Sequence, residues 1–389
     1  MTSKAFVRNQ LHVPHLGIFL LLIALPSGYV FGVPVKPVLL GIAVSYVVLT
    51  APAIRVSLSV VALSWALLSF FVLYAALGSL TWGSLAWREL QMVLSPFVIA
   101  ALILLWLTAG DPYKRFGALL FAVLSVLGLT KFVMLLVGYE AASEGFRHIF
   151  GVGFVSMAIP YGLFRINLPT DILAAFAPAM LGWLALKQRI PGGGTAVWLF
   201  LGISFFIVLI SFSRTLWVLF GFSMFFFFLF LGAGIRSWLF LIILATLSLL
   251  VGWEFVSTRF SPETIGVSDE IRHEQASALT DLWLRAPFFG HGLGAYNAAL
   301  IRSAQEPYSY ELQLLSFLPK LGVVGLFFLM IPASLGLLFL VMTRNFLALS
   351  LVSLLLLVSA FNPYMLNSSM ALFYAFIGIV MKTQMSRTA

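Results

Sequence analysis

The chain has 389 residues, of which 62% are hydrophobic and only 9% are charged. Soluble globular proteins have about 45 to 50% apolar and about 25% charged residues, so this composition excludes a water-soluble fold. The formal charge of +9 does not indicate a nucleic-acid-binding protein, because the basic residues are scattered singly between apolar runs. The chain has no cysteine, which excludes disulfides, thiol nucleophiles and thiolate metal sites.

Apolar runs of membrane-spanning length recur along the whole chain. A helix crosses the hydrocarbon with about 20 residues, and about 17 can suffice. About twelve runs reach this length, which predicts an all-α polytopic membrane protein. Lys4 and Arg8 precede the first run, which we interpret as a retained helix and not as a cleavable signal. The runs are residues 15–31, 37–54, 57–77, 90–109, 116–138, 171–187, 195–212, 215–233, 237–254, 317–342, 346–361 and 367–381.

The positions of Lys and Arg predict which loops face the cytoplasm. With the N-terminus inside, the inner segments are basic, and Asp111 is the only acid among them. This arrangement follows the positive-inside rule and places both termini in the cytoplasm. The inner basic residues are Lys4, Arg8, Arg55, Lys114, Arg115, Lys187, Arg189, Arg236, Arg344, Lys382 and Arg387.

The same orientation leaves two longer outer segments, residues 139–170 and 255–309. We therefore expect nine helices in residues 1–254, a large extracytoplasmic loop with short helices in 255–316, and three helices in 317–389. Topology does not account for the arginines on the outer side, and an anionic ligand is the simplest reason for them. These arginines are Arg147, Arg165, Arg214, Arg259, Arg272, Arg285 and Arg302.

The large loop contains a predicted helix. Ser268, followed by Asp269 and Glu270, is typical of a helix start, because a hydroxyl cap and early carboxylates suit the exposed amide end. The helix is expected to end near Arg285, before Pro287 and a run of glycines. Arg272 is expected on a different side from the residues that share a face at helical spacing. Those residues are Ile271, Gln275, Leu279, Leu282 and Trp283.

Three features of the outer side could carry chemistry. Arg214, in Ser211-Phe-Ser-Arg214 between two spans, is either a snorkelling arginine or part of a ligand cavity. The run Gly290-His-Gly-Leu-Gly294 either cradles a phosphate or forms a tight turn, and the missing strand-to-helix context favours the turn. Glu311, where the chain returns to the membrane, is either a general base or a salt-bridge partner.

Other ionisable residues give weaker signals. His148, His273 and His291 match no metal-binding spacing, so no metal site is predicted. Lys131 is the one charge expected well inside a span, where it either snorkels to the surface or lines a cavity.

The chain resembles the bacterial O-antigen ligase and O-antigen polymerase superfamily of membrane glycosyltransferases. The resemblance covers the layout of about twelve spans with one large outer loop, and it is sharpest from Arg165 to Gly325. It implies a GT-C-like fold in the bacterial inner membrane, with an active site that faces the periplasm and needs no cofactor. The motifs that carry it are Ser211-Phe-Ser-Arg214, Pro287-Phe-Phe-Gly290-His-Gly292-Leu-Gly294 and Gly322-Val-Val-Gly325.

The sequence departs from the ligase branch at one position. That branch has His-Asn or His-Ser, nine further residues and then Gly-x-x-Gly, whereas this chain has Glu311-Leu312 before Gly322. The departure favours a polymerase of lipid-linked repeat units, with a ligase to lipid A core or another acceptor as the alternative. A transporter of a lipid-linked anionic glycan is a third possibility. Because no internal repeat is found, we favour catalysis over transport.

The resemblance also implies roles for individual residues. Arg214 and Arg272, with Arg165 as a third, would hold the diphosphate of an undecaprenyl-diphosphate-linked glycan, and Glu311 would accept the acceptor's proton. For an enzyme, Arg214, Arg272 and Glu311 should converge in one cavity. Further substrate-binding residues are expected at Arg147, Arg285, His291 and Tyr310. The implied partners are the lipid bilayer and a chain-length regulator and flippase of the same pathway.

Overall fold

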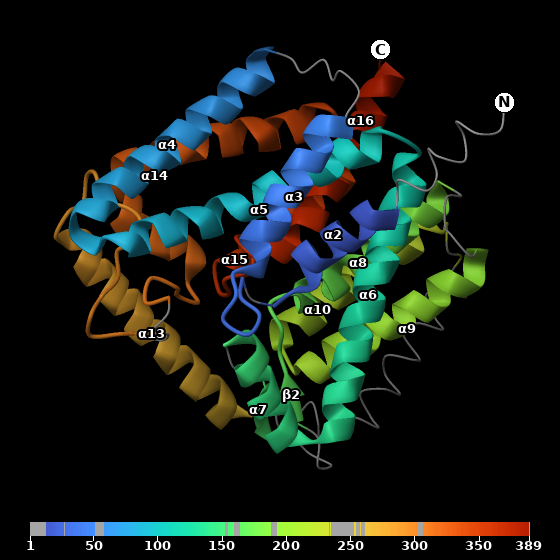
Figure 1. Ribbon diagram of the computed structural model, residues 1–389, viewed down its shortest axis with the longest axis horizontal. Helices are drawn as coiled ribbons and strands as arrows, with labels where there is room; N and C mark the ends of the chain where they lie inside the picture. Colours follow the sequence, from blue (N-terminus) through green and yellow to red (C-terminus); the bar gives the residue numbers. More distant parts are fainter. Residues whose placement is uncertain are drawn as a thin grey trace. The chain divides into compact units, whose positions relative to one another are not determined.

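The computed structural model is mainly α-helical (Figure 1). The described strands, β1 (Val155–Ala158) and β2 (Phe164–Ile166), form a two-stranded antiparallel sheet. The chain divides into two compact units, which we describe separately. Unit 1 is Met1–Pro52, Phe97–Ser261 and Ser368–Ile379, and unit 2 is Ala53–Pro96, Pro262–Asn367 and Val380–Ala389. The structure describes residues 13–26, 28–50, 58–151, 155–158, 164–187, 193–232, 234, 253, 257, 261–301 and 306–388.

The centre of unit 1 is helix α8 (Asp171–Leu186), whose residues from Asp171 to Leu184 are all buried. It packs against α9 (Gly193–Ser211) and α10 (Arg214–Phe230). Gly182 permits a close approach to α10, because a Cβ atom there would lie 2.8 Å from the Cα of Phe227. The other helices of this unit are α2 (Val13–Ala24), α3 (Val35–Thr50), α6 (Pro112–Val137), α7 (Tyr139–Phe150) and the short 3₁₀ helix η2 (Ser368–Met370).

Unit 2 is built on α4 (Leu58–Trp82) and α14 (Gln313–Met342), which lie side by side in Figure 1. The unit also contains α13 (Pro262–Leu284) and α15 (Phe346–Ser359), whereas α5 (Ser84–Thr108) and α16 (Ala371–Thr388) contribute residues to both units. A hydrophobic core joins the helices to the segment after α13. Its buried members are Phe71, Tyr74, Ala75, Leu90, Val93, Leu293, Phe317, Leu321 and Leu366.

Helix α14 is interrupted at Gly322, which has a left-handed backbone with φ of 64°. A residue with a side chain is strained in this region, so glycine suits the position. The interruption frees two amides of the helix. Those of Val323 and Val324 donate to the carbonyls of Pro287 and Phe288 at 2.9 and 3.0 Å. The two motifs Pro287–Gly294 and Gly322–Gly325 are therefore interlocked through their main chains.

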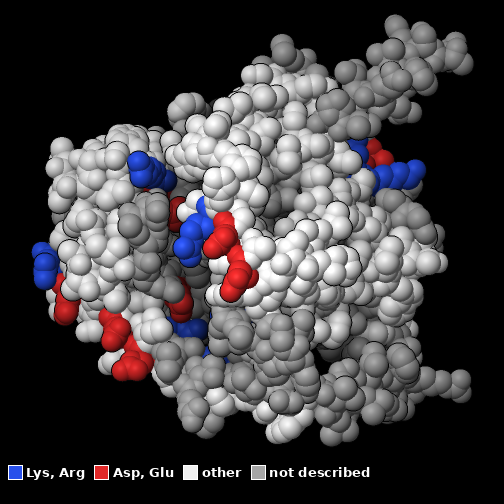
Figure 2. All heavy atoms as spheres, turned by 60° about the horizontal axis from the view of Figure 1, so that its bottom comes forward, with Lys and Arg blue, Asp and Glu red and all other residues white. Residues whose placement is uncertain are grey.

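The helices have the length and surface of a membrane protein. Five of them are long and apolar enough to cross a bilayer, and shorter apolar helices lie at the other predicted spans in the described part of the chain. The predicted span 237–254 lies outside the described residues. Large apolar side chains are exposed, including Leu80 at 84% and Met342 at 75%. On the face shown in Figure 2, the charged side chains of the described residues occupy only a few places. Such a surface is suited to lipid.

Several helix starts and ends differ from the predicted ones, and three of them have a clear cause or consequence. Helix α2 ends at Ala24 instead of residue 31, because Pro26 cannot continue a helix. Helix α13 begins at Pro262 instead of Ser268, and proline is favourable at the first position of a helix. Helix α5 begins at Ser84 instead of residue 90, so Glu89 lies inside the helix.

Candidate functional site

A cluster of polar side chains joins α13 to the segment that leads into α14, all within unit 2. The Nε atom of Arg272 lies 3.6 Å from Oε2 of Glu311, and Nη1 of Arg272 bonds to Oδ1 of Asp269 at 3.2 Å. The side chains of Arg272 and Glu311 are each 25% exposed. An ion pair with this exposure contributes only about 0 to 1 kcal/mol to stability, so stability alone is a weak reason for the arrangement. Glu311 is thus an ion-pair partner of Arg272, and its role as a general base remains a prediction.

Gln275 connects the same helix to the backbone of Glu311. Its Oε1 accepts a hydrogen bond of 2.9 Å from the Glu311 amide, and its side chain is fully buried. Among the described residues, neither Nε2 of Gln275 nor Nε of Arg272 has a hydrogen-bond acceptor. Buried donors of this kind are rare in proteins and are often found at functional sites. The cluster therefore has unused hydrogen-bonding capacity beside a carboxylate.

The structure corrects the expected positions of Arg272 and Ile271 on α13. Arg272 and Gln275 both contact Glu311, so they lie on the same side of the helix, whereas we expected them on different sides. Ile271, expected on the buried face, is 39% exposed. Leu279 is buried as expected, and it packs with Tyr310 and Leu312.

Tyr310 fixes the backbone next to Glu311, in the segment that leads into α14. Its side chain is buried, and its hydroxyl accepts a 2.8 Å hydrogen bond from the amide of Asn297. Burial raises the pKa of the Tyr310 hydroxyl above its usual value of 10, and the hydrogen bond from Asn297 partly opposes this change. The predicted site residue Tyr310 is thus near the cluster, where it supports the backbone on which Glu311 lies.

The glycine run forms a tight turn whose amides are already used. The amides of Gly290, His291, Gly292, Leu293 and Gly294 donate to Ala286, Pro319, Lys320, Tyr74 and Glu89, in that order. A phosphate cradle needs several free amides that converge on the ligand. The predicted tight turn is confirmed, and the phosphate-cradle interpretation is wrong for this conformation.

A buried ion pair holds this turn in place. Nζ of Lys320 lies 2.5 Å from Oε1 of Glu89, and both side chains are almost inaccessible, at 2% and 1% exposure. The second carboxylate oxygen of Glu89 accepts the Gly294 amide, and Lys320 also donates to the carbonyl of Tyr308 at 2.9 Å. The pair therefore joins α5, α14, the glycine turn and the segment that leads to Glu311.

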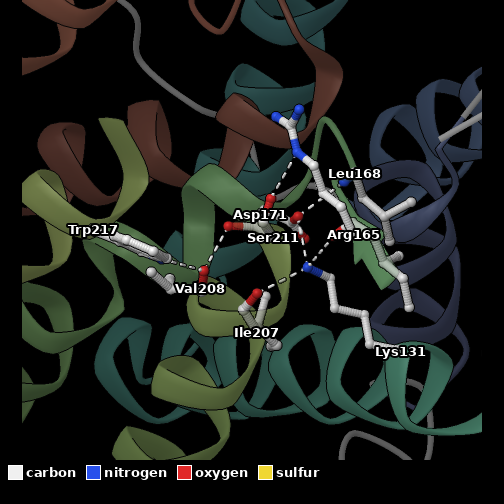
Figure 3. Close-up of polar contacts among 9 residues, drawn as sticks. Lys131, Arg165, Leu168, Asp171, Ile207, Val208, Ser211 and Trp217 are labelled. Carbon is white, nitrogen blue, oxygen red and sulfur yellow. Dashed lines mark hydrogen bonds and ion pairs between the residues drawn. The ribbon is translucent and has the colours of Figure 1, made fainter. Parts of the chain in front are cut away.

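Unit 1 contains a second buried pair, which is shown in Figure 3. Lys131 on α6 is fully buried, and its Nζ bonds to Oδ2 of Asp171 at 2.7 Å. The same Nζ donates to the carbonyls of Ile166 and Ile207, both at 2.8 Å. Asp171 Oδ2 accepts a further hydrogen bond from the Leu168 amide at 2.9 Å. Lys131 therefore neither snorkels nor lines an open cavity, contrary to both expectations.

Arg165 lies where this network ends, as Figure 3 shows. Nε of Arg165 donates to the carbonyl of Ser211, the last residue of α9, at 3.1 Å. Phe212 follows in a left-handed conformation with φ of 47°, and Arg214 is the first residue of α10. The half-exposed Arg214 is thus at the amide end of a helix, where a positive charge is electrostatically unfavourable unless an anion is present.

The remaining predicted residues are distributed over both units. Arg147 lies on the exposed side of α7 in unit 1, and Arg285 is exposed just after α13 in unit 2. The ring of His291 contacts the carbonyl of Leu282 through Nε2 at 2.8 Å, which ties the glycine turn to α13. Arg214 belongs to unit 1 and Arg272 to unit 2, so the convergence of both arginines with Glu311 remains a prediction.

No family model, curated protein or solved structure matches the chain.

The sequence analysis missed Glu89, Lys320, Asp171 and the polar role of Gln275. Lys131 was expected to be the one charge well inside a span, but Lys320 lies within α14 and Glu89 within α5. A charge inside or next to an apolar run is itself a signal, because it needs a partner in the membrane. This signal predicts that Glu89, Lys320 and Asp171 each have a partner of opposite charge, but it does not identify that partner.

Proposed function

We propose that the chain is a membrane glycosyltransferase that polymerises undecaprenyl-diphosphate-linked oligosaccharide repeat units. The observation that supports this proposal is the pairing of Arg272 with Glu311, because it places a guanidinium and a carboxylate together at the end of a membrane helix. These are the two groups that glycosyl transfer from a lipid diphosphate requires without a metal: a cation for the leaving group and a base for the acceptor.

The proposed setting is the bacterial inner membrane, with about twelve spans, a large periplasmic loop and both termini in the cytoplasm. Support comes from the helices at the predicted spans and from their exposed apolar side chains. Within unit 1, Arg165, Ser211 and Arg214 lie at one end of the helix group, as the predicted topology requires for periplasmic residues. A flippase that delivers the lipid-linked unit and a chain-length regulator would be partners of the same pathway.

In the proposed reaction, a hydroxyl of the acceptor glycan attacks the anomeric carbon of the donor glycan. The bond from that carbon to the diphosphate oxygen breaks, and undecaprenyl diphosphate leaves with the electron pair. Glu311 accepts the hydroxyl proton, and a single displacement inverts the anomeric configuration. Arg272 stabilises the negative charge that develops on the diphosphate, and the resemblance implies the same role for Arg214 and Arg165.

Glu311 is suited to this role by its contacts. Gln275 holds its backbone and Arg272 orients its carboxylate, while a quarter of the side chain stays accessible to an acceptor. The 3.6 Å separation from Arg272 Nε exceeds the length of a hydrogen bond. The carboxylate is therefore positioned without a short bond from this nitrogen that would compete with a substrate hydroxyl.

The proposal is tested with purified protein in lipid nanodiscs and a defined undecaprenyl-diphosphate-linked repeat unit. A ladder of longer lipid-linked products is expected, and both Arg272→Ala and Glu311→Gln should abolish it. Glu274→Gln is the control, because this exposed residue lies on the same helix. Near wild-type activity in Glu311→Gln would exclude Glu311 as the base.

Two other outcomes would replace the proposal. Transfer of the glycan only to lipid A core, or to another acceptor lipid, would identify a ligase. Movement of the intact lipid-linked unit across the membrane, with no new glycosidic bond, would identify a transporter.

A further inference from the structure

We propose that Lys131 and Asp171 are positioning residues that set the geometry of Arg165 and Arg214 for a diphosphate ligand. The inference rests on the proposed function, since it concerns the same donor group. It is carried by the network in Figure 3, in which the ammonium group of Lys131 joins three separate elements beside Arg165.

Each acceptor of Lys131 belongs to a different element. The carbonyl of Ile166 lies in β2, directly after Arg165, and the carbonyl of Ile207 lies in the last turn of α9. The third acceptor is the carboxylate of Asp171, which is the first residue of α8. A lysine has three protons to donate, and all three have an acceptor here. Lys131 has therefore no donor left for a ligand, which leaves it a positioning role.

The end of α9 depends on side chains for its hydrogen bonds. A helix leaves its last four carbonyls without partners inside the helix, and a glycine cap often supplies them. Here the residue after α9 is Phe212, and its amide bonds to the carbonyl of Leu209 at 3.1 Å. The carbonyl of Val208 accepts from Ser211 Oγ and Trp217 Nε1, at 2.6 and 3.1 Å. Arg165 Nε supplies the bond to the Ser211 carbonyl.

This geometry couples the two arginines. Arg165 belongs to β2, and Lys131 holds this strand in place through its bond to the carbonyl of Ile166. Arg165 in turn donates a hydrogen bond to the carbonyl of Ser211, the last residue of α9. Arg214 follows three residues after Ser211, beyond the left-handed Phe212. A left-handed conformation in a bulky residue is strained and persists only where its surroundings fix it. Loss of Lys131 should therefore loosen β2 and the α9–α10 junction together.

Stability alone does not explain a fully buried pair. Replacement of such a pair by apolar residues of similar volume is often neutral or stabilising, whereas loss of one partner is strongly destabilising. The double variant Lys131→Met with Asp171→Leu is therefore the informative one, because it removes the network without leaving an isolated charge. Asp171→Asn can keep the hydrogen bonds to Lys131 and to the Leu168 amide, but it removes the counter-charge of the buried ammonium group.

The test measures binding of inorganic pyrophosphate by calorimetry, with the protein in nanodiscs of neutral lipid. The double variant should stay folded but bind pyrophosphate about tenfold more weakly, a loss of about 1.4 kcal/mol, because displaced guanidinium groups lose part of their charge-assisted hydrogen bonds to the anion. The KM for the lipid-linked donor should rise by a similar factor while kcat changes less. Asp171→Asn should lie between the wild type and the double variant. Lys114→Met, an exposed lysine on the same helix, is the matched control and should bind as the wild type does.

Three outcomes would overturn the inference. The first is wild-type pyrophosphate affinity in a folded double variant, which would show that Lys131 and Asp171 serve only the packing of unit 1. The second is a parallel loss of binding, kcat and folded protein, because a general defect in folding predicts no separation of KM from kcat. The third is undiminished binding in both Arg165→Ala and Arg214→Ala, which would mean that these arginines form no anion site. The product ladder tests the proposed function separately, so a failure here is distinguishable from a failure of glycosyl transfer.

Discussion

Glu89 and Lys320 face each other in the interior of unit 2, although 231 residues separate them in the sequence. Through Gly294 and Tyr308, the pair also holds the two segments that flank the loop before Glu311. The candidate base is therefore attached to a buried charge network within the helices, and not only to the loop helix α13.

Substitution of one member of this pair should destabilise unit 2 strongly. Lys320→Met leaves the Glu89 carboxylate buried without its cation, and such a change costs about 3 to 5 kcal/mol. The double variant Glu89→Leu with Lys320→Met should recover part of this loss, because no isolated charge remains. The thermal denaturation temperature in detergent measures both effects, with Lys114→Met, an exposed lysine, as the control. A loss in the double variant equal to the sum of the losses in Glu89→Leu alone and Lys320→Met alone would contradict the pairing.

Gly292 should tolerate no side chain. Its φ is 81°, and a Cβ atom would overlap the backbone of Gly78 in α4. The left-handed backbone alone costs a residue such as alanine roughly 1 kcal/mol, and the overlap adds to it. We expect Gly292→Ala to lower both the denaturation temperature and the activity.

Gly336 provides the control for this prediction. It lies in α14 with an ordinary helical φ, and a Cβ atom there would meet no described heavy atom within 4 Å beyond the backbone of its own helix. Gly336→Ala should leave the denaturation temperature unchanged or raise it, because alanine favours a helix by up to about 1 kcal/mol. A Gly292→Ala protein as stable as Gly336→Ala would show that the turn is not packed as described.

Local signals predicted most helices and the tight turn. A run of about 20 apolar residues fixes a membrane helix through composition alone, and glycines at 290, 292 and 294 indicate left-handed turns through their own conformational freedom. Helix ends were less predictable. Pro26 stops α2 earlier than its apolar run, and α5 continues through polar residues such as Arg88 and Glu89.

The pairing of buried charges could not be read from the sequence. Lys131 and Asp171 are 40 residues apart, and Glu89 and Lys320 are much further apart, so no local spacing relates them. For the candidate site, helical spacing placed Gln275 with Leu279 and Leu282 on the buried face, and all three are buried. The bond from the Glu311 amide to Gln275 depends on how the segment before α14 packs against α13, and helical periodicity does not encode that packing.

Gln275 should affect catalysis more than stability. Gln275→Leu removes the acceptor of the Glu311 amide, which costs about 1 to 3 kcal/mol if that amide stays buried. It also removes a buried Nε2 that has no acceptor among the described residues, and this change is favourable. The two effects oppose each other in the free energy of unfolding, but both disturb the surroundings of Glu311.

The rate of product-ladder formation should therefore fall at least about tenfold in Gln275→Leu, with a change in denaturation temperature of only a few degrees. Thr280→Val is the control, since this exposed hydroxyl on α13 bonds only to its own helix in the described structure. Unchanged turnover in Gln275→Leu would show that its bond to Glu311 has no influence on the reaction.

The buried Tyr310 should make the stability of the folded protein sensitive to alkaline pH. Burial raises its pKa in the folded protein above the usual value of 10, so the folded state keeps the phenol proton to higher pH than the unfolded state does. The stability that this difference contributes is fully present below a pH of about 10 and is lost as the pH rises through the folded pKa. Tyr310→Phe removes this contribution together with the bond from the Asn297 amide, which is worth about 1 kcal/mol. The variant should be less stable at neutral pH and lose less stability than the wild type between pH 9 and 11.

Denaturation temperatures measured from pH 7 to 11 test this prediction, with Tyr29→Phe as the control at an exposed tyrosine. Parallel curves for the wild type and Tyr310→Phe would exclude the proposed titration.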